Sequence, residues 1–440
     1  MAVRGVIAAA ISSLLLAALA LAGPAQATRP FAPLDQPGPP LSVPRSKLRA
    51  ALKCEPSVRN ARVEPVLLNP ATGVTAKENY SWNWERALRK LGIPWCAYTA
   101  PHNALGNIET SGEYLVYAIR TVHRMAHRPI AVMGHSQGGM SMRWALRFWP
   151  DTRHMVKDVI GFAGSNHGTT VFSPQDCEPL GCAPATWQQL STAHFIKALN
   201  SYVETFAGIS YTEVYTHTDE VVEPNSAPKP SQCSSCLYTG KGKITNVATQ
   251  QICPLDVYEH LGVGTIDPVA YALGVNALRR RGPAAPSQIP SSVCSEAYMP
   301  GVNPANVNNE LELLRAAPGL LGVAVGPVAK EFGVPALHHE PPLACYVFAA
   351  CRGKDAPNLE LSYTRSRSGD QTILHPLVRV REGYQLIPVA GARLTIAGHR
   401  VRTDAAGRAA LPVGLVAGRK YRLTASRPGC NTAVAAVSAG

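Results

Sequence analysis

The stretch Ala131-Val-Met-Gly-His-Ser136-Gln-Gly-Gly139 is a short apolar run that ends in the pattern Gly-x-Ser-x-Gly. A helical periodicity follows it and ends at Pro150. This order indicates strand, sharp turn and helix, which is a nucleophile elbow that lifts Ser136 above a buried strand at a helix N-terminus. Gly134 and Gly138 leave room for the crowded turn. The alternative, a chance match in a loop, is disfavoured by the strand before it and the helix after it.

Strands and helices alternate on both sides of the elbow. Expected strands cover residues 63–68, 93–98, the elbow run, 159–163, 212–216 and 244–248, and expected helices cover 81–91, 113–125 and 268–281. Such alternation predicts βαβ units and a largely parallel sheet. The predicted fold class is therefore α/β, an α/β-hydrolase with a mostly parallel central sheet.

The N-terminus has the composition of a secretory signal peptide over residues 1–27. Arg4 precedes an apolar stretch from Val6 to Ala22, and Ala25-Gln-Ala27 is a small-x-small cleavage site. An uncleaved membrane anchor is the alternative, and the cleavage triplet argues against it. We expect cleavage after about Ala27 and secretion. The Pro-rich leader, residues 28–47, is expected to be extended and poorly ordered, with packed structure from about Leu48.

The chain changes character near its C-terminal end. We expect the hydrolase domain to span residues 48–353. Its segment 303–334 has too many Gly and Pro residues for a membrane span and is interpreted as a helical, apolar cap over the site, with an ordinary core helix as the alternative. After a linker, residues 359–440 show short alternating runs and Gly-containing turns, which predict a small antiparallel β-sandwich. This module loosely resembles Ig-like or transthyretin-like modules.

The eleven cysteines fit an exported protein, in which thiols pair. Two close pairs, Cys177/Cys182 and Cys233/Cys236, predict short disulfides. The alternative for Cys233-Ser-Ser-Cys236 is a redox or zinc motif, but no second Cys or His pair stands at zinc spacing. We expect no metal and no cofactor.

The net charge of +13 is uneven along the chain. From Arg352 onward there are fourteen Lys and Arg against five Asp and Glu, a net +9. The arginines alternate with apolar residues, as in Arg400-Val-Arg402, and aromatic stacking platforms are missing, so solvated strand faces explain them better than nucleic-acid binding. A weak attraction to anionic surfaces remains compatible with this charge.

An exposed serine needs a histidine to take its proton and an acid to orient that histidine. In α/β-hydrolases these follow the serine in the order acid, then His. Asp219 stands at the carboxyl end of an expected strand, where open α/β sheets place their sites, and Glu220 and Glu223 are its alternatives. His260 lies in a loop after the last expected strand. The other histidines fit the order less well: His167, His194 and His217 precede Asp219, and His338 and His339 come late.

The oxyanion of the reaction needs two backbone amides. One is expected from Gln137, directly after the nucleophile, and the other from the turn Pro70-Ala-Thr72-Gly73 after an early strand.

From about Cys54 to Pro304 the chain resembles the Candida antarctica lipase B family of α/β-hydrolases. The shared landmarks are Pro65-Val-Leu-Leu-Asn-Pro-Ala-Thr-Gly73, Glu113-Tyr-Leu-Val-Tyr-Ala-Ile119, Ser136-Gln-Gly-Gly139, Phe148-Trp-Pro150, Trp187-Gln-Gln189, Thr218-Asp-Glu-Val-Val222 and Tyr258-Glu-His260.

Carried over residue by residue, the resemblance implies particular roles. Ser136 is the nucleophile, His260 the general base and acid, and Asp219 its orienting carboxylate. Thr72 and Gln137 form the oxyanion hole, to which Thr72 adds its hydroxyl. The resemblance also implies the disulfides Cys54–Cys96 and Cys253–Cys294, and leaves Cys345, Cys351 and Cys430 as one pair and one spare.

Two features depart from the family pattern. His135 stands where the yeast enzyme has a tryptophan, which puts the small alcohol-side pocket in doubt. His135 could be mistaken for the base, but a residue adjacent to Ser136 points away from its Oγ atom. The C-terminal β module has no counterpart in the yeast enzyme.

We therefore expect a secreted, monomeric serine esterase or lipase that cleaves carboxylic esters of lipids through an acyl-enzyme. Its expected partners are a lipid or small ester and a lipid–water interface or anionic cell surface, with no nucleic acid. The enzymatic alternatives are an acyltransferase or a polyester hydrolase, because other acceptors can discharge the same acyl-enzyme. The non-enzymatic alternative is a surface-binding protein on a hydrolase scaffold.

Overall fold

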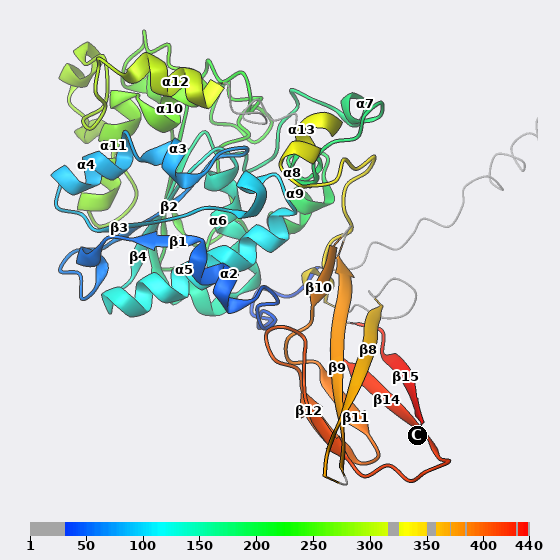
Figure 1. The fold of residues 1–440 in the computed structure, drawn as a ribbon. Helices are drawn as coiled ribbons and strands as arrows, with labels where there is room; N and C mark the ends of the chain where they lie inside the picture. The colour runs from blue at the N-terminus through cyan, green and yellow to red at the C-terminus, as the bar shows by residue number, and fades with distance from the viewer. Residues whose placement is uncertain are drawn as a thin grey trace, which may run out of the picture.

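The computed structural model describes residues 31–315, 325–349, 358–369, 371–382, 385–427 and 430–438. The expected signal peptide and its cleavage site lie outside these ranges. A seven-stranded sheet in the order β1-β3-β2-β4-β5-β6-β7 organises the larger part of the chain (Figure 1). Its strands are β1 (Leu52–Cys54), β2 (Val66–Asn69), β3 (Trp95–Tyr98), β4 (Ile130–His135), β5 (Val156–Phe162), β6 (Ser210–Tyr215) and β7 (Lys243–Ala248).

Strands β2 to β7 pair in parallel, and only β1 runs antiparallel, against β3. The six strands expected from the sequence are all present, each with boundaries within a few residues of the prediction, so the α/β prediction is confirmed. Strand β1 was not predicted, because three residues, of which only the outer two are partly buried, are too few to give a periodic signal.

Helices cover both faces of this sheet. On one face lie α5 (Ile108–Ala126) and α6 (Gln137–Phe148), packed on Ile130 and Val132 of β4. On the other lie α4 (Trp84–Lys90) and α11 (Pro268–Arg279), packed on Ala131 and Met133. Successive residues of a strand point to opposite faces, so a strand buried on both faces reads as a continuous apolar run, as β4 does.

The remaining helices are short and lie in the connections. They are α2 (Arg45–Ala50), α3 (Ala76–Tyr80), α7 (Pro174–Cys177), α8 (Pro184–Gln188), α9 (His194–Leu199), α10 (His260–Thr265), α12 (Val307–Arg315) and α13 (Gly326–Glu331).

Helix α12 belongs to the segment that was expected to cap the site. Its Val307 and Leu311 side chains pack against Ala71, Val74 and Leu261. Because these residues flank Thr72 and follow His260, α12 covers the loops that carry both. Residues 316–324, the middle of the expected cap, lie outside the described residues.

The expectation of a poorly ordered leader is wrong for residues 31–44, which pack on the hydrolase domain. Arg147 donates to the carbonyl of Ala32 at 2.6 Å, and Trp149 donates to that of Pro39 at 2.9 Å. The buried carboxylate of Glu113 accepts from the Ser42 hydroxyl at 2.6 Å and from the Val43 amide at 3.1 Å. Buried donors and acceptors on α5 and α6 thus hold a segment whose own composition gives no reason to fold.

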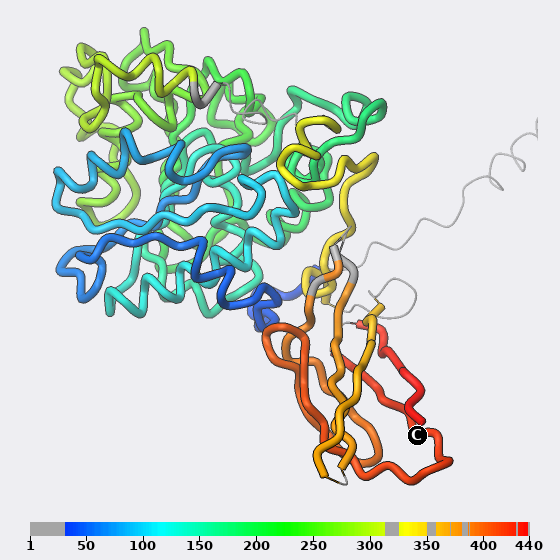
Figure 2. Tube along the Cα trace, viewed as in Figure 1, coloured from blue at the N-terminus to red at the C-terminus, as the bar shows by residue number. Residues whose placement is uncertain are grey.

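The C-terminal segment forms two antiparallel four-stranded sheets, which Figure 2 shows as a separate orange-to-red part of the trace. The first contains β8 (Leu359–Ser368), β9 (Gln371–Glu382), β10 (Gln385–Pro388) and β13 (Leu411–Val413); the second contains β11 (Arg393–Ile396), β12 (His399–Arg402), β14 (Lys420–Ser426) and β15 (Ala433–Ser438). Buried residues of both sheets, such as Val378 and Leu423, share one apolar cluster. That cluster is separate from the clusters of the hydrolase domain.

Four disulfides join the pairs expected from spacing or from the family resemblance: Cys54–Cys96, Cys177–Cys182, Cys233–Cys236 and Cys253–Cys294. Cys345 is disulfide-bonded as well, and Cys351 lies outside the described residues. The disulfide between Cys233 and Cys236 argues against the zinc alternative, because bridged sulfurs carry no thiolate to bind the metal.

Candidate active site

Ser136 occupies the turn between β4 and α6 in a strained backbone conformation, with φ 55° and ψ −126°. A Cβ atom on Gly138 would lie 2.2 Å from the carbonyl oxygen of Asn69, and one on Gly134 would lie 2.3 Å from that of Gly138. The amide of Ser136 donates to the carbonyl of Phe162 at 2.9 Å. Contacts this close permit only glycine at positions 134 and 138. The geometry of the turn therefore accounts for the Gly-x-Ser-x-Gly pattern of the sequence.

Asp219 and His260, far apart in the sequence, meet beyond the carboxyl ends of the strands. The Nδ1 atom of His260 lies 2.9 Å from Oδ1 of Asp219, and both side chains are almost fully buried. The same Oδ1 accepts from the amides of Val221 at 3.0 Å and Val222 at 2.8 Å, and Asn225 donates to Oδ2 at 3.2 Å. These donors fix the carboxylate, which in turn fixes the tautomer and orientation of the imidazole.

The electrostatics of His260 suit a base. Burial lowers its pKa, but the charge and hydrogen bond of Asp219, with smaller contributions from the charges of Glu220 and Glu259, raise the pKa above its usual value. The opposite ring atom, Nε2, is buried and has no hydrogen-bond partner within the described part of the chain. It therefore has a free lone pair when Nδ1 carries the proton.

The alternative acids and histidines lie elsewhere or make other contacts. Glu220 accepts from the backbone amide of His260 at 3.2 Å and not from its ring. No hydrogen bond of the described residues joins the Glu223 carboxylate to His260. Four of the other histidines have their own partners: His167 pairs with Glu204, His194 with Glu340, His217 with the Asn225 carbonyl and His338 with the Glu178 carbonyl.

Thr72 and Gln137 lie side by side, since Nε2 of Gln137 donates to Oγ1 of Thr72 at 3.0 Å. A second amide, Nε2 of Gln189, donates to the same oxygen at 3.2 Å. Both amide orientations are fixed, because each Nε2 also donates to a backbone carbonyl. A hydroxyl has two lone pairs and one hydrogen, so these two bonds leave the Thr72 hydroxyl its proton to donate.

The backbone amides of Thr72 and Gln137 make no hydrogen bond among the described residues. That of Gln137 is the first in α6, where helix geometry supplies no partner. Two amides and one hydroxyl beside Ser136 thus have hydrogens available for an anionic oxygen.

A narrow pocket of about 10 Å³ opens at these groups. Its lining joins residues predicted from the sequence with residues that were not: Thr72, Ser136, Ser165, Thr169, Phe172, Gln189, Val221 and Val222. Periodicity could not identify Ser165, Thr169 and Phe172, because they lie in an irregular connection. The sequence identified Gln189 only as part of the family landmark Trp187-Gln-Gln189, without a role in the site. The volume is close to that of one water-sized sphere.

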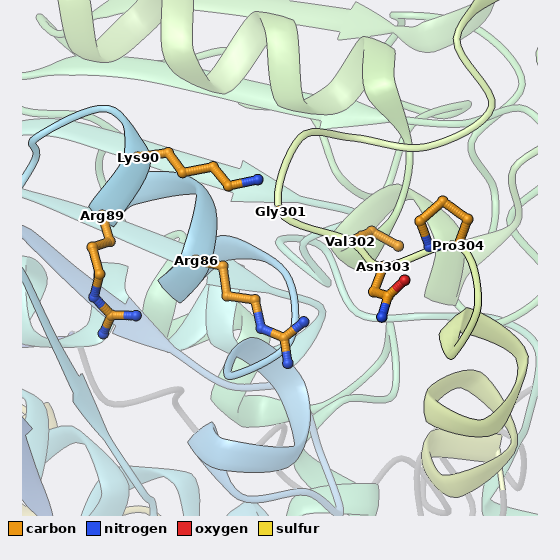
Figure 3. A pocket seen from close by; sticks show the side chains of 7 residues that line it. All are labelled: Arg86, Arg89, Lys90, Gly301, Val302, Asn303 and Pro304. Atoms are coloured by element: carbon orange, nitrogen blue, oxygen red, sulfur yellow. The ribbon is translucent and has the colours of Figure 1, made fainter.

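A larger cavity of about 530 Å³ lies beside α4, where Arg86 and Lys90 reach toward the loop Gly301–Pro304 (Figure 3). Arg89 also lines it and pairs with Glu55 at 2.7 Å. Its walls carry three cationic side chains together with Gly301, Val302, Asn303 and Pro304, but no Ser, Cys, His or carboxylate side chain. The smaller pocket at Ser136 is therefore the candidate active site, because nucleophilic chemistry needs such groups.

Two known proteins are similar to this chain over much of its length, although no protein-family model matches it. Lipase B of Pseudozyma antarctica is 32% identical over 243 residues, which cover 55% of this chain and 69% of that protein. The crystal structure of Aspergillus fumigatus lipase B is 30% identical and has a TM-score of 0.63; the match covers 74% of this chain and 77% of that one. The chain therefore belongs to the lipase B family, and it is a carboxylic ester hydrolase with the α/β-hydrolase fold.

Proposed function

We propose that the chain is a secreted lipase or esterase that hydrolyses lipid esters through an acyl-enzyme on Ser136. The observation that carries the proposal is the buried Asp219–His260 pair beside the Ser136 elbow, together with the available donors of Thr72 and Gln137. The four disulfides and the apolar N-terminal stretch support secretion.

In the first half-reaction Oγ of Ser136 attacks the ester carbonyl while Nε2 of His260 takes its proton. Asp219 stabilises the imidazolium that forms, and the oxyanion accepts from the amides of Thr72 and Gln137 and from the Thr72 hydroxyl. His260 then protonates the departing alcohol. In the second half-reaction His260 deprotonates a water, which attacks the acyl carbonyl; the bond to Oγ of Ser136 then breaks, the acid leaves, and His260 returns the proton to Oγ.

Ser136 and His260 make no direct hydrogen bond in the described residues. Such contacts are often long without substrate and shorten in the complex. The mechanism requires the Ser136 hydroxyl to come within hydrogen-bond reach of Nε2 of His260, whose ring is already held by Asp219.

The test is Ser136→Ala, assayed on a p-nitrophenyl ester and on an emulsified triglyceride. Turnover is expected to fall by several orders of magnitude, and labelling by a fluorophosphonate is expected to disappear. Retained hydrolysis in the folded variant would refute the proposal. Product analysis in the presence of an alcohol acceptor distinguishes hydrolysis from acyl transfer.

A further inference from the structure

His135, the last residue of β4, is buried beside the proposed nucleophile, and the proposed reaction gives it no role. Burial lowers the pKa of its ring to about 3, so the ring is neutral near neutral pH. A neutral imidazole has one nitrogen that donates and one that accepts. The contacts of the ring show which nitrogen donates and which accepts.

The Nε2 atom of His135 lies 3.0 Å from the backbone carbonyl oxygen of His260. A carbonyl only accepts, so Nε2 carries the hydrogen and Nδ1 is the acceptor. Nδ1 lies 3.4 Å from Nδ2 of Asn79, whose Oδ1 accepts from the amide of Ala71 at 2.8 Å. Neither ring nitrogen is left to accept the proton of Ser136, which excludes His135 as an alternative base.

These bonds form one chain through three parts of the site. It runs from Ala71, the neighbour of Thr72, through Asn79 and His135, the neighbour of Ser136, to the backbone of His260. The loops for the oxyanion, the nucleophile and the base are thus joined by side chains that take no part in the chemistry.

Packing around the ring supports a specific fit. The rings of His135 and His260 lie with their centroids 5.1 Å apart. On the α10 side, a Cβ atom on Gly264 would come within 2.2 Å of Cδ2 of His135. Helix α10, which begins at His260, therefore packs directly against the ring of His135, and only a glycine fits at the point of contact.

We propose that His135 is a positioning residue that holds the backbone of His260, and thereby directs its Nε2 atom toward Ser136. The proposal rests on the proposed function for its kinetic consequences. Its geometric content, the bond from His135 to the His260 carbonyl, does not depend on which ester is cleaved.

Two variants of similar size separate the effect of the hydrogen bond from the effect of the volume that the His135 side chain fills. In His135→Gln the side-chain amide can reach the His260 carbonyl as a donor, whereas His135→Met fills the same space with no donor. For His135→Met we expect kcat to fall about tenfold with KM changed less than about twofold, and His135→Gln to restore kcat to within about threefold. Thermal unfolding of both variants checks that they fold.

A second readout does not need turnover. The proton on Nδ1 of His260, bonded to Asp219, should give a downfield NMR resonance that is protected from exchange in the wild type and in His135→Gln. In His135→Met it should exchange faster, because the ring is held less firmly. Equal behaviour of the two variants in both measurements, or wild-type behaviour of His135→Met, would overturn the proposal. If the wild type hydrolyses no ester, the proposed function fails, and the NMR comparison still decides the role of His135.

Discussion

The hydroxyl of Thr72 accepts from two side-chain amides, so its single hydrogen is left for the pocket. We predict that Thr72→Val, which keeps shape and backbone amide but removes this donor, lowers kcat about 10²- to 10³-fold. Thr72→Ser keeps the hydroxyl, and its kcat should fall by less than about tenfold. Steady-state kinetics on one soluble ester compare the two variants. A fully active Thr72→Val variant would show that the hydroxyl does not contribute to the oxyanion hole.

The pH dependence of the reaction follows from the environment of His260. The ring must be neutral to accept a proton, and Asp219 raises its pKa above 6.5, so kcat/KM should rise with pH through a midpoint above 6.5. Asp219→Asn removes the negative charge. Its midpoint should move to lower pH while kcat falls roughly 10³- to 10⁴-fold.

Glu220→Gln is the matched control for this pH profile. Its carboxylate raises the pKa of His260 less than Asp219 does and bonds the backbone amide, not the ring. The midpoint should therefore move in the same direction by less, with kcat nearly retained. An unchanged midpoint in Asp219→Asn would contradict the assigned source of the shift.

Much of the site could be predicted from residue order and local pattern. The elbow has a local signature. The order acid then His narrowed the acid to Asp219, Glu220 or Glu223 and favoured His260, and the family resemblance then implied Asp219 and His260. The contacts of His135 and the two donors to Thr72 could not be predicted, because they join residues between 56 and 125 positions apart. Neither composition nor periodicity encodes such contacts.

At the scale of elements, the crossing of α6 over β2 depends on Gly138. A Cβ atom there would lie 2.2 Å from the carbonyl of Asn69, and backbone cannot move aside as a flexible side chain can. We predict that Gly138→Ala destabilises the fold by about 1–3 kcal/mol and lowers kcat, because Ser136 and the amide of Gln137 move with the turn.

Gly414→Ala is the matched control for that substitution, because a Cβ atom there has no neighbour within 4 Å. Urea unfolding should give a free energy of unfolding within about 0.5 kcal/mol of the wild type. Equal stability of the Gly138→Ala and Gly414→Ala variants would show that the elbow tolerates a side chain.

The elements themselves followed from sequence wherever a pattern was long. Short apolar runs predicted the strands of the large sheet, and the amphipathic pattern over residues 113–125 predicted most of α5. The ordered leader did not follow, because it is held by side chains of α5 and α6, such as Glu113 and Arg147. The leader has no hydrophobic periodicity of its own, so its structure depends on its contacts with these helices.

At the scale of the whole molecule, stability depends on carboxylates buried behind the nucleophile helix. Glu213 of β6 is fully buried and accepts from Nδ2 of Asn166 at 3.0 Å. Burial raises its pKa to about 8, although Arg143 and that hydrogen bond act the other way. Glu204 differs: burial alone would raise its pKa, but His167, Arg143 and the amide of Tyr238 lower it to about 2.

The two groups have opposite consequences for unfolding. The folded state holds the proton of Glu213 up to pH 8, whereas the unfolded chain releases it near pH 4.5, so the free energy of unfolding falls between these values. For Glu204 the unfolded chain takes up a proton first as the pH drops, so stability is present above pH 4.5 and is lost toward pH 2.

We therefore predict that Glu213→Gln reduces the loss of stability between pH 5 and pH 8 and is more stable than the wild type at pH 8, by a few kcal/mol at most, at about 1.4 kcal/mol for each pKa unit. Glu204→Gln should flatten the slope below pH 4.5 and change the slope between pH 5 and 8 only slightly, because the charge of Glu204 is the smallest of the named influences on the pKa of Glu213. Urea unfolding at pH 3, 5, 6.5 and 8 measures both. A wild-type slope in Glu213→Gln between pH 5 and 8 would mean that this carboxyl is already ionised in the folded protein, with Arg143 compensating its burial.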